Sequence, residues 1–91
     1  MKYTIQTTNK FKKDLRLVQS RGYKIELLTE VINKLASGES LDEKNKDHDL
    51  QGNWVGYREC HIQPDWLLIY KVDNDELILW MTRTGTHSDL F

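Results

Sequence analysis

The sequence has one cysteine, Cys60, and no apolar run that approaches the ~20 residues of a membrane-spanning helix. One cysteine cannot form an internal disulfide, and metal sites built on cysteine usually need more than one. We therefore expect Cys60 to be a small buried hydrophobic residue. Residues 1–9 lack the basic-then-apolar layout and the small-residue cleavage site of a secretory signal. These absences predict a soluble, cytoplasmic protein without a membrane segment.

The sequence also lacks a large excess of charge of either sign. It has 13 Lys and Arg and 14 Asp and Glu residues, which give a formal net charge of -1. This balance argues against a protein that binds nucleic acid through bulk positive charge. Basic residues nevertheless crowd one short segment, and such a local patch is compatible with a neutral whole. They are Lys10, Lys12, Lys13, Arg16 and Arg21.

The length of 91 residues, of which 38% are hydrophobic and 30% charged, is enough for one domain with one core, covering residues 1–91. Residues 2–6 alternate as a short strand does. Thr8 or Asn9 can cap a first helix that stops at Gly22, and a second helix stops at Gly38. Their apolar residues recur at helical spacing, which predicts a helical hairpin. They are Phe11, Leu15 and Val18, then Ile25, Leu28, Val31, Ile32 and Leu35.

The second half predicts a β-meander after a long polar connection over residues 40–52. Strand-like runs cover residues 54–61, 65–72 and 76–83. Residues 67–70 are apolar throughout, which indicates a central strand covered on at least part of both faces. The order is therefore β-α-α-β-β-β, an α+β fold in which the helical hairpin packs on a mainly antiparallel four-stranded sheet.

Candidate chemistry gathers in this second half, which holds all three histidines: His48, His61 and His87. Histidine is the side chain best suited to proton transfer near neutral pH, so acid/base catalysis is one interpretation. The alternative is that each histidine is a surface or structural residue. A three-residue connection after His61 would place it opposite Asp65 in a hairpin, where the carboxylate would fix the imidazole tautomer.

The second hairpin gives a conflicting orientation. A tight turn at residues 74–75 pairs Val72 with Leu77 and, counting back, Trp66 with Arg83. This pair and the pair at the first hairpin point to opposite faces. A site shared by both pairs therefore requires the sheet to twist, bulge or end near Asp65.

The segment from Lys46 to Phe91 resembles the YafQ-type toxins of the RelE superfamily. The resemblance is carried by Asp47-His48, Leu50-Gln51-Gly52, Trp54, Gly56-Tyr57-Arg58, His61, Pro64-Asp65-Trp66, Leu68-Ile69-Tyr70, Arg83-Thr84-Gly85-Thr86-His87 and Leu90-Phe91. It implies a RelE-like fold and a toxin of a toxin–antitoxin pair that cuts messenger RNA on the ribosome. It further implies an antitoxin, the ribosome and messenger RNA as partners, and no metal or other cofactor.

The resemblance also implies residue roles. His48, His61, His87 and Asp65 would form the proton-transfer group, with base and acid not assigned among them, and Arg83 would face the scissile phosphate. Such cleavage needs a base for the 2′-OH, a cation for the phosphate and an acid for the leaving 5′-oxygen.

Three side chains are candidates for holding RNA. The resemblance implies that Trp66 and Phe91 belong to the site, where we expect them to be exposed and to stack on bases. Phe91 could instead plug the core, and Arg58 could serve either a structural ion pair or a general RNA contact. The remaining strand aromatics are more typical of core or sheet surface. They are Trp54, Tyr57, Tyr70 and Trp80.

Two other functions fit the sequence. One is a catalytically silent module that keeps the fold and only binds an antitoxin or the ribosome, as the near-neutral charge would allow. The other is a zinc site, because His48, His61, His87, Cys60 and Asp65 are zinc-compatible. The absence of a short two-ligand spacing such as His-x-x-x-His disfavours it.

Overall fold

The two long helices begin and end where the sequence predicts in the computed structural model, which describes all residues 1–91. Helix α1 spans Asn9–Ser20 and is capped by Thr8, whose hydroxyl accepts a hydrogen bond from the Phe11 N–H at 3.0 Å. Helix α2 spans Ile25–Ala36. Gly22 and Gly38 follow the helices with φ angles of 80° and 79°, a left-handed conformation that suits glycine. No helix is long and apolar enough to cross a membrane.

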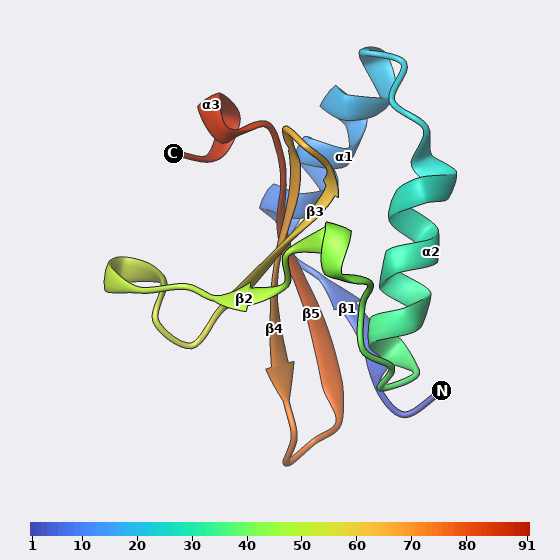
Figure 1. Cartoon of the computed structure of the whole chain (residues 1–91), viewed down its shortest axis with the longest axis vertical. Coiled ribbons are helices and arrows are strands. Elements are labelled where there is room, and N and C mark those ends of the chain that lie inside the picture. Colours follow the sequence, from blue (N-terminus) through green and yellow to red (C-terminus); the bar gives the residue numbers. More distant parts are fainter.

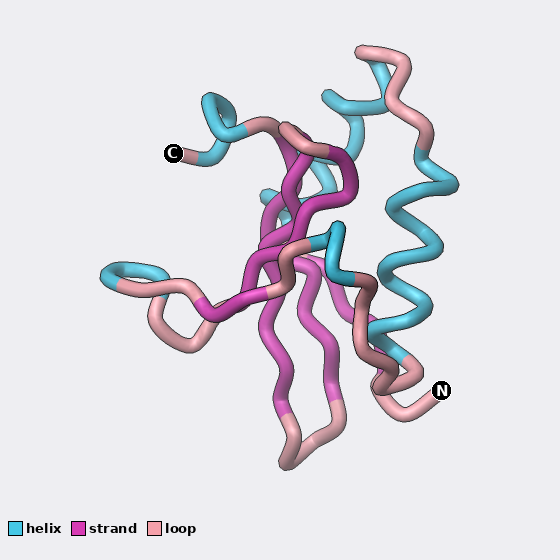
Figure 2. The backbone as a smooth tube through the Cα atoms, viewed as in Figure 1, coloured by secondary structure: helices cyan, strands magenta, loops and turns pink.

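The sheet contains the four predicted strands and one short addition (Figures 1 and 2). The strands are β1 (Thr4–Thr7), β2 (His48–Asp49), β3 (Arg58–Gln63), β4 (Trp66–Asp73) and β5 (Ile78–Gly85). They lie in the order β1-β5-β4-β3-β2, with β1 parallel to β5 and the other pairs antiparallel. The two-residue strand β2, which the sequence did not predict, and the 3-10 turn η1 (Glu43–Asn45) form part of the long connection.

Strand β4 is the central strand, and side chains cover both of its faces, as predicted. Leu68 and Tyr70 belong to the main core between the sheet and the helices, which lie on one side of it in Figure 1. Leu67 and Ile69 belong to a smaller cluster on the other face, closed by Leu90 from the short helix α3 (His87–Leu90). The second face is therefore covered only in part.

Both predicted hairpin registers are wrong. His61 lies opposite Leu67 rather than Asp65, because a β-bulge follows His61 and Asp65 lies in the turn before β4. In the second hairpin Val72 pairs with Leu79, because the turn is wider than two residues. The predicted irregularity near Asp65 is confirmed, since the strand pairing ends there.

A second bulge lies in β5, where the partners step from Met81, opposite Tyr70, to Arg83, opposite Ile69. Thr82 is the extra residue, and it changes which face the following side chains occupy. The predicted pairing of Trp66 with Arg83 is therefore also wrong.

Strand β3 begins at Arg58, four residues later than predicted. The preceding segment forms a second 3-10 turn, η2 (Gly52–Trp54). Gly52 and Gly56 have φ angles of 63° and 92°, which are incompatible with an extended strand. Trp54 consequently lies in a projecting loop and not in the sheet (Figure 1).

Candidate active site

Candidate residues of four strands form one row across the open face of the sheet. His48 in β2 pairs with Glu59 in β3, Glu59 with Ile69 in β4, and Ile69 with Arg83 in β5. Directly opposite residues of a β-ladder share a face. Because Ile69 belongs to the cluster away from the long helices, the row lies on the face opposite α1 and α2.

The next row places His61 beside Leu67 on the same face. The His61 ring is 16% exposed, and its Nδ1 lies 3.1 Å from the Pro64 carbonyl oxygen. Because a carbonyl can only accept, this contact places a proton on Nδ1 and leaves Nε2 facing the site.

His87 is held by Asp65 at the start of α3. One Asp65 carboxylate oxygen accepts hydrogen bonds from the His87 backbone N–H at 3.0 Å and from its Nδ1 at 2.6 Å. The backbone hydrogen bond is the larger cause, and the side-chain bond the next, of the lowering of the pKa of Asp65 below its ordinary 3.8. The His61 and His87 ring centroids lie 5.9 Å apart. The structure thus brings together His61, His87 and Asp65 from the predicted set.

The start of α3 is itself fixed in place. Thr86 and Asp89 form a capping box, and Asp89 also binds the Arg21 guanidinium, with an Nη1 to Oδ2 distance of 2.6 Å. The Arg21 hydrogen bond is the main cause that lowers the pKa of Asp89. Arg21 therefore links α1 to the helix that carries His87.

Glu59 is a central residue of this site that was not among the predicted residues. Its side chain is 8% exposed and lies between two imidazoles, 3.5 Å from His48 Nε2 and 4.0 Å from His61 Nε2. The His48 Nδ1 lies 2.6 Å from the Lys46 carbonyl oxygen, so His48 also presents Nε2 to Glu59. The signal in the sequence was the spacing of Glu59 and His61, which are two residues apart in a strand and therefore share a face.

Arg83 shares this face, and its guanidinium is paired with Asp14 of α1. The Nε to Oδ2 distance is 2.6 Å and the Nη2 to Oδ1 distance is 3.1 Å. Asp14 also accepts from the Thr84 N–H at 3.2 Å, along the edge of β5 that faces away from β4. This pairing raises the pKa of Arg83 and leaves Nη1 without a protein partner. Asp14 was likewise not predicted.

Arg58 makes the ion pairs expected from the structural alternative. Its guanidinium lies 2.6 Å from Asp49, 3.3 Å from Asp47 and 3.2 Å from the Tyr70 hydroxyl. These contacts tie the segment that carries His48 to strands β3 and β4.

The expectation that Trp66 stacks on bases is wrong in its premise, because Trp66 is 1% exposed. Its indole N–H donates to the Thr84 hydroxyl at 2.9 Å, and its ring lies edge-on to Tyr23 with centroids 5.0 Å apart. A tryptophan packed on both sides cannot receive a base.

Phe91 is 61% exposed, and its neighbour Leu90, at 9%, fills the core position instead. Phe91 is therefore no plug. Its ring lies edge-to-face with Trp54, at a centroid distance of 6.3 Å, and Trp54 packs in the same way on Tyr57 at 5.4 Å. Trp54 and Tyr57 pack against the smaller apolar cluster, so this group of three aromatic rings lies on the same face of the sheet as His61.

Cys60 is fully buried, and burial raises the pKa of its thiol, as expected for a small core residue. It belongs to the main core, on the face opposite Glu59 and His61. The five zinc-compatible side chains named above are therefore not one cluster.

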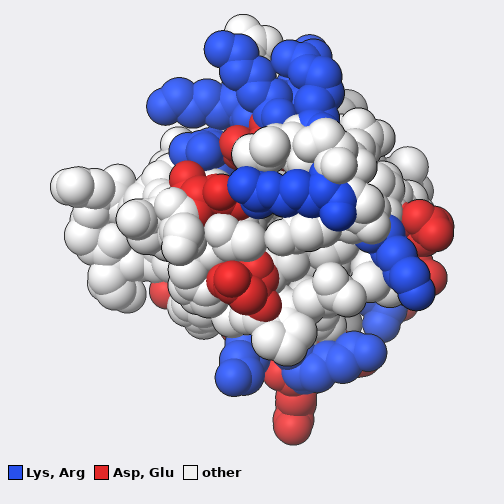
Figure 3. Space-filling view, turned by 90° about the horizontal axis from the view of Figure 1, so that it is seen from above, with Lys and Arg blue, Asp and Glu red and all other residues white.

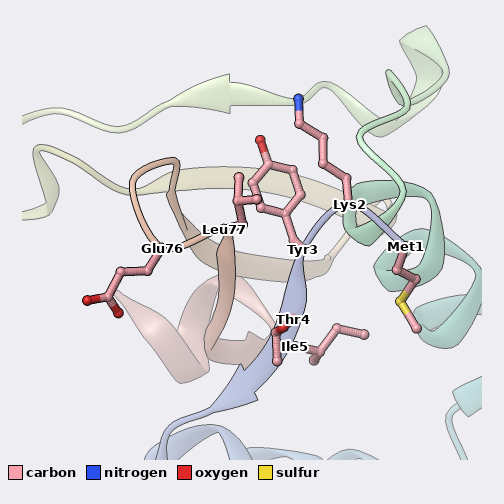
Figure 4. A pocket seen from close by; sticks show the side chains of 7 residues that line it. All are labelled: Met1, Lys2, Tyr3, Thr4, Ile5, Glu76 and Leu77. Atoms are coloured by element: carbon pink, nitrogen blue, oxygen red, sulfur yellow. The ribbon is translucent and has the colours of Figure 1, made fainter.

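A cavity of about 490 Å³ lies away from these residues, between β1 and the turn before β5. Figure 4 shows Tyr3 and Leu77 among its walls, with Lys2 and Glu76 as its charged residues. It contains no histidine, and the segments that line it, β1 and the turn before β5, lie away from α3 in Figure 1. The candidate site is instead the open face around His61 and His87.

Comparison with known proteins gives consistent matches over nearly the whole chain. The family described as "Bacterial toxin of type II toxin-antitoxin system, YafQ" matches residues 3–91. The "mRNA interferase toxin YafQ" of Escherichia coli strain K12 is 40% identical over 88 residues, which are 96% of this chain and 94% of that protein.

Solved structures agree with this family. A structure described as the metal-bound toxin from Helicobacter pylori is 43% identical, covers 98% of this chain and 99% of that chain, and has a TM-score of 0.93. The toxin in the E. coli DinJ-YafQ complex is 39% identical over 98% of each chain, with a TM-score of 0.89.

Proposed function

This chain belongs to the YafQ family of bacterial type II toxin–antitoxin toxins, and on that premise we propose that it is a ribosome-dependent endoribonuclease that cleaves messenger RNA. The observation that carries the catalytic part is the pair of imidazoles at 5.9 Å, one of them held by Asp65. Both rings lie on the open face that also holds Arg83.

The reaction requires three groups that this face offers. A base takes the proton of the ribose 2′-OH, whose oxygen attacks the neighbouring phosphorus, and an acid protonates the departing 5′-oxygen of the next nucleotide. We assign these two roles to His61 and His87, whose ring centroids lie 5.9 Å apart. Each presents Nε2, because its Nδ1 is held by a protein oxygen.

Stabilisation of the transition state needs positive charge at the crowded phosphate. Arg83 supplies it through Nη1, the edge of its guanidinium that Asp14 leaves open. Glu59 and Asp65 are positioning residues, since each acts through an imidazole. With these groups the chain's own side chains carry the acid/base chemistry without a metal.

Binding to the ribosome is proposed to use α1. Its exposed Lys10, Lys12, Lys13 and Arg16 form no ion pair with the protein, and its one acid, Asp14, is neutralised by Arg83. Figure 3 shows Lys and Arg side chains gathered along one rim of the molecule, on the side where α1 lies. A cationic face of this kind suits phosphate-rich ribosomal RNA despite the net charge of -1.

A cognate antitoxin is the second proposed partner. The E. coli relative has been solved in complex with DinJ. We expect an acidic or amphipathic antitoxin segment to cover the open face and its histidines. We propose that the protein acts in the cytoplasm, where ribosomes translate messenger RNA.

Expression of the chain alone tests this function. We expect growth arrest by the wild type and relief by His87→Ala and by Arg83→Ala, with Asp75→Ala, at an exposed turn residue, as the matched control. Thermal unfolding confirms that each variant is folded. Arrest by both folded variants at the wild-type level would contradict the assignment and favour the silent interaction module.

A further inference from the structure

We propose that a second cavity, beside His61, binds one base and phosphate of the messenger RNA next to the phosphate that is cleaved. This inference rests on the proposed function and adds a substrate site to it. The cavity has a volume of about 460 Å³ and lies between α2, the turn η1 and the end of β3. That volume falls within the range of ~300–1,000 Å³ that is typical of small-molecule sites.

The walls suit an unpaired nucleobase. Leu27, Ile62 and Pro64 provide apolar surface from three different elements, against which the flat face of a base can pack. The exposed Gln63 places a side-chain amide at the same cavity, while Asn45 forms part of its wall. Amides can donate to and accept from the edges of a base, so the cavity combines packing with hydrogen bonding.

Two cations, Lys44 and Lys46, lie at the mouth of the cavity. Both side chains are exposed, and neither forms an ion pair with the protein. An ammonium group without a carboxylate partner is free to bind a phosphate. The charge thus matches the sugar-phosphate chain that leads from the cavity to the histidines.

The cavity wall also holds the histidines in place. Asn45, 7% exposed, donates from its side-chain nitrogen to the His61 carbonyl at 2.7 Å. The Lys46 carbonyl oxygen holds His48 Nδ1, and Lys46 has a φ of 46°, a left-handed conformation that costs energy in a residue other than glycine. A nucleotide seated here would therefore contact the same residues that hold the His48 ring and the His61 backbone.

A neighbouring cavity of about 380 Å³ continues the path. It shares Gln63 and Pro64 with the cavity beside His61, and its lining includes Asp65, which holds His87. The chain of a single-stranded RNA can thus pass around the turn between β3 and β4, close to both imidazoles.

Nuclear magnetic resonance of the isotope-labelled full chain tests the site directly. The probes are the four nucleoside 5′-monophosphates, titrated separately. We expect saturable shifts confined to the amides of residues 44–46 and 61–64, with one base preferred. Lys44→Glu should weaken binding on the order of tenfold, and Lys24→Glu, at an exposed lysine that lines no cavity, should leave it unchanged. Shifts centred elsewhere, or equal affinity in Lys44→Glu, would overturn the proposal.

Measuring messenger RNA cleavage by the ribosome-bound protein tests the nucleotide site separately from the proposed ribonuclease function. Lys44→Glu should raise KM and change which bases flank the cut, with kcat retained. Unchanged KM and unchanged flanking bases would overturn the nucleotide site while leaving the ribonuclease function intact. If the wild type binds nucleotides but cuts no messenger RNA, the proposed function fails and the binding site stands.

Discussion

Asp65 holds His87 by two atoms at once, because one carboxylate oxygen accepts from the backbone N–H at 3.0 Å and from the imidazole Nδ1 at 2.6 Å. The first bond fixes where α3 begins and the second fixes the ring. Although both side chains are more than half exposed, the imidazole has one orientation and one tautomer. This arrangement distinguishes His87 from a free surface histidine and supports the acid/base role proposed for it.

Asp65→Asn should therefore reduce cleavage by about 10²-fold or more, within the range attributed to a positioned acid or base. The amide keeps the size of the side chain but removes the charge that stabilises an imidazolium. Single-turnover cleavage on ribosomes measures the effect, with Asp75→Asn as the control. Wild-type rates in Asp65→Asn would show that His87 needs no orienting carboxylate.

The lowered pKa of Asp65 gives a prediction on pH. A carboxyl group with a depressed folded-state pKa contributes stability above its unfolded value, near 3.8, and loses it as pH falls through the lower folded value. Asp65 should thus stay ionised throughout the neutral and mildly acidic range. Carbon-detected magnetic resonance of its carboxyl group should give a midpoint below 3.8. A midpoint at or above that value would contradict the two hydrogen bonds from His87.

Arg83→Lys tests the two-sided use of the guanidinium. A lysine can keep the charge but cannot bind Asp14 through two nitrogens and still present a third to a phosphate. We expect cleavage to fall by about 10²-fold, as for loss of one donor to a developing charge. Arg16→Lys, at an exposed residue of α1, is the matched control. Wild-type cleavage by Arg83→Lys would indicate that the positive charge alone suffices, and would contradict a placed guanidinium donor.

Glu59→Gln should lower activity without lowering stability. Glu59 is a nearly buried carboxylate that makes no hydrogen bond within the protein apart from its approach to two imidazoles. A neutral amide of the same size costs less to bury, so the melting temperature should hold or rise. The same change removes the negative charge that faces both imidazoles, so cleavage should slow by about tenfold or more. Full activity in this variant would remove Glu59 from the account.

Phe91→Ala should weaken RNA binding with little change in stability, whereas Leu90→Ala should mainly lower stability. Phe91 is mostly exposed, so its loss should change the free energy of unfolding by less than about 0.5 kcal/mol. It should weaken RNA binding by ~1–3 kcal/mol if the ring stacks on a base. Leu90→Ala should cost about 2 kcal/mol or more of stability through the lost core packing. Binding of a short oligonucleotide and chemical denaturation of both variants measure these terms.

The sequence predicted the elements of the fold well because the information for them is local. Thr8, Gly22 and Gly38 mark helix ends through their own hydrogen bonds and backbone angles. The unbroken apolar run in β4 indicated a central strand because only such a strand buries both faces.

The strand registers and the finer geometry of the site depend on contacts between residues far apart in the sequence, so the sequence pattern did not predict them. The bulge at Thr82 changes the face of the sheet on which the following side chains of β5 lie. No pattern of residues in the sequence predicts this bulge. Trp66 was expected at the surface because the family resemblance implicated it in holding RNA, but its side chain is buried in the core beside Tyr23. Asp14 could not be predicted because its partner, Arg83, is 69 residues away.

The central claim is that His87 performs chemistry on messenger RNA held by the ribosome. Primer-extension mapping of a messenger RNA in a purified translation reaction tests it most directly, with the wild type beside folded His87→Ala. The account predicts cuts that need both ribosomes and the wild-type histidine. Cuts of equal strength in His87→Ala, or no cuts from folded wild-type protein, would contradict it.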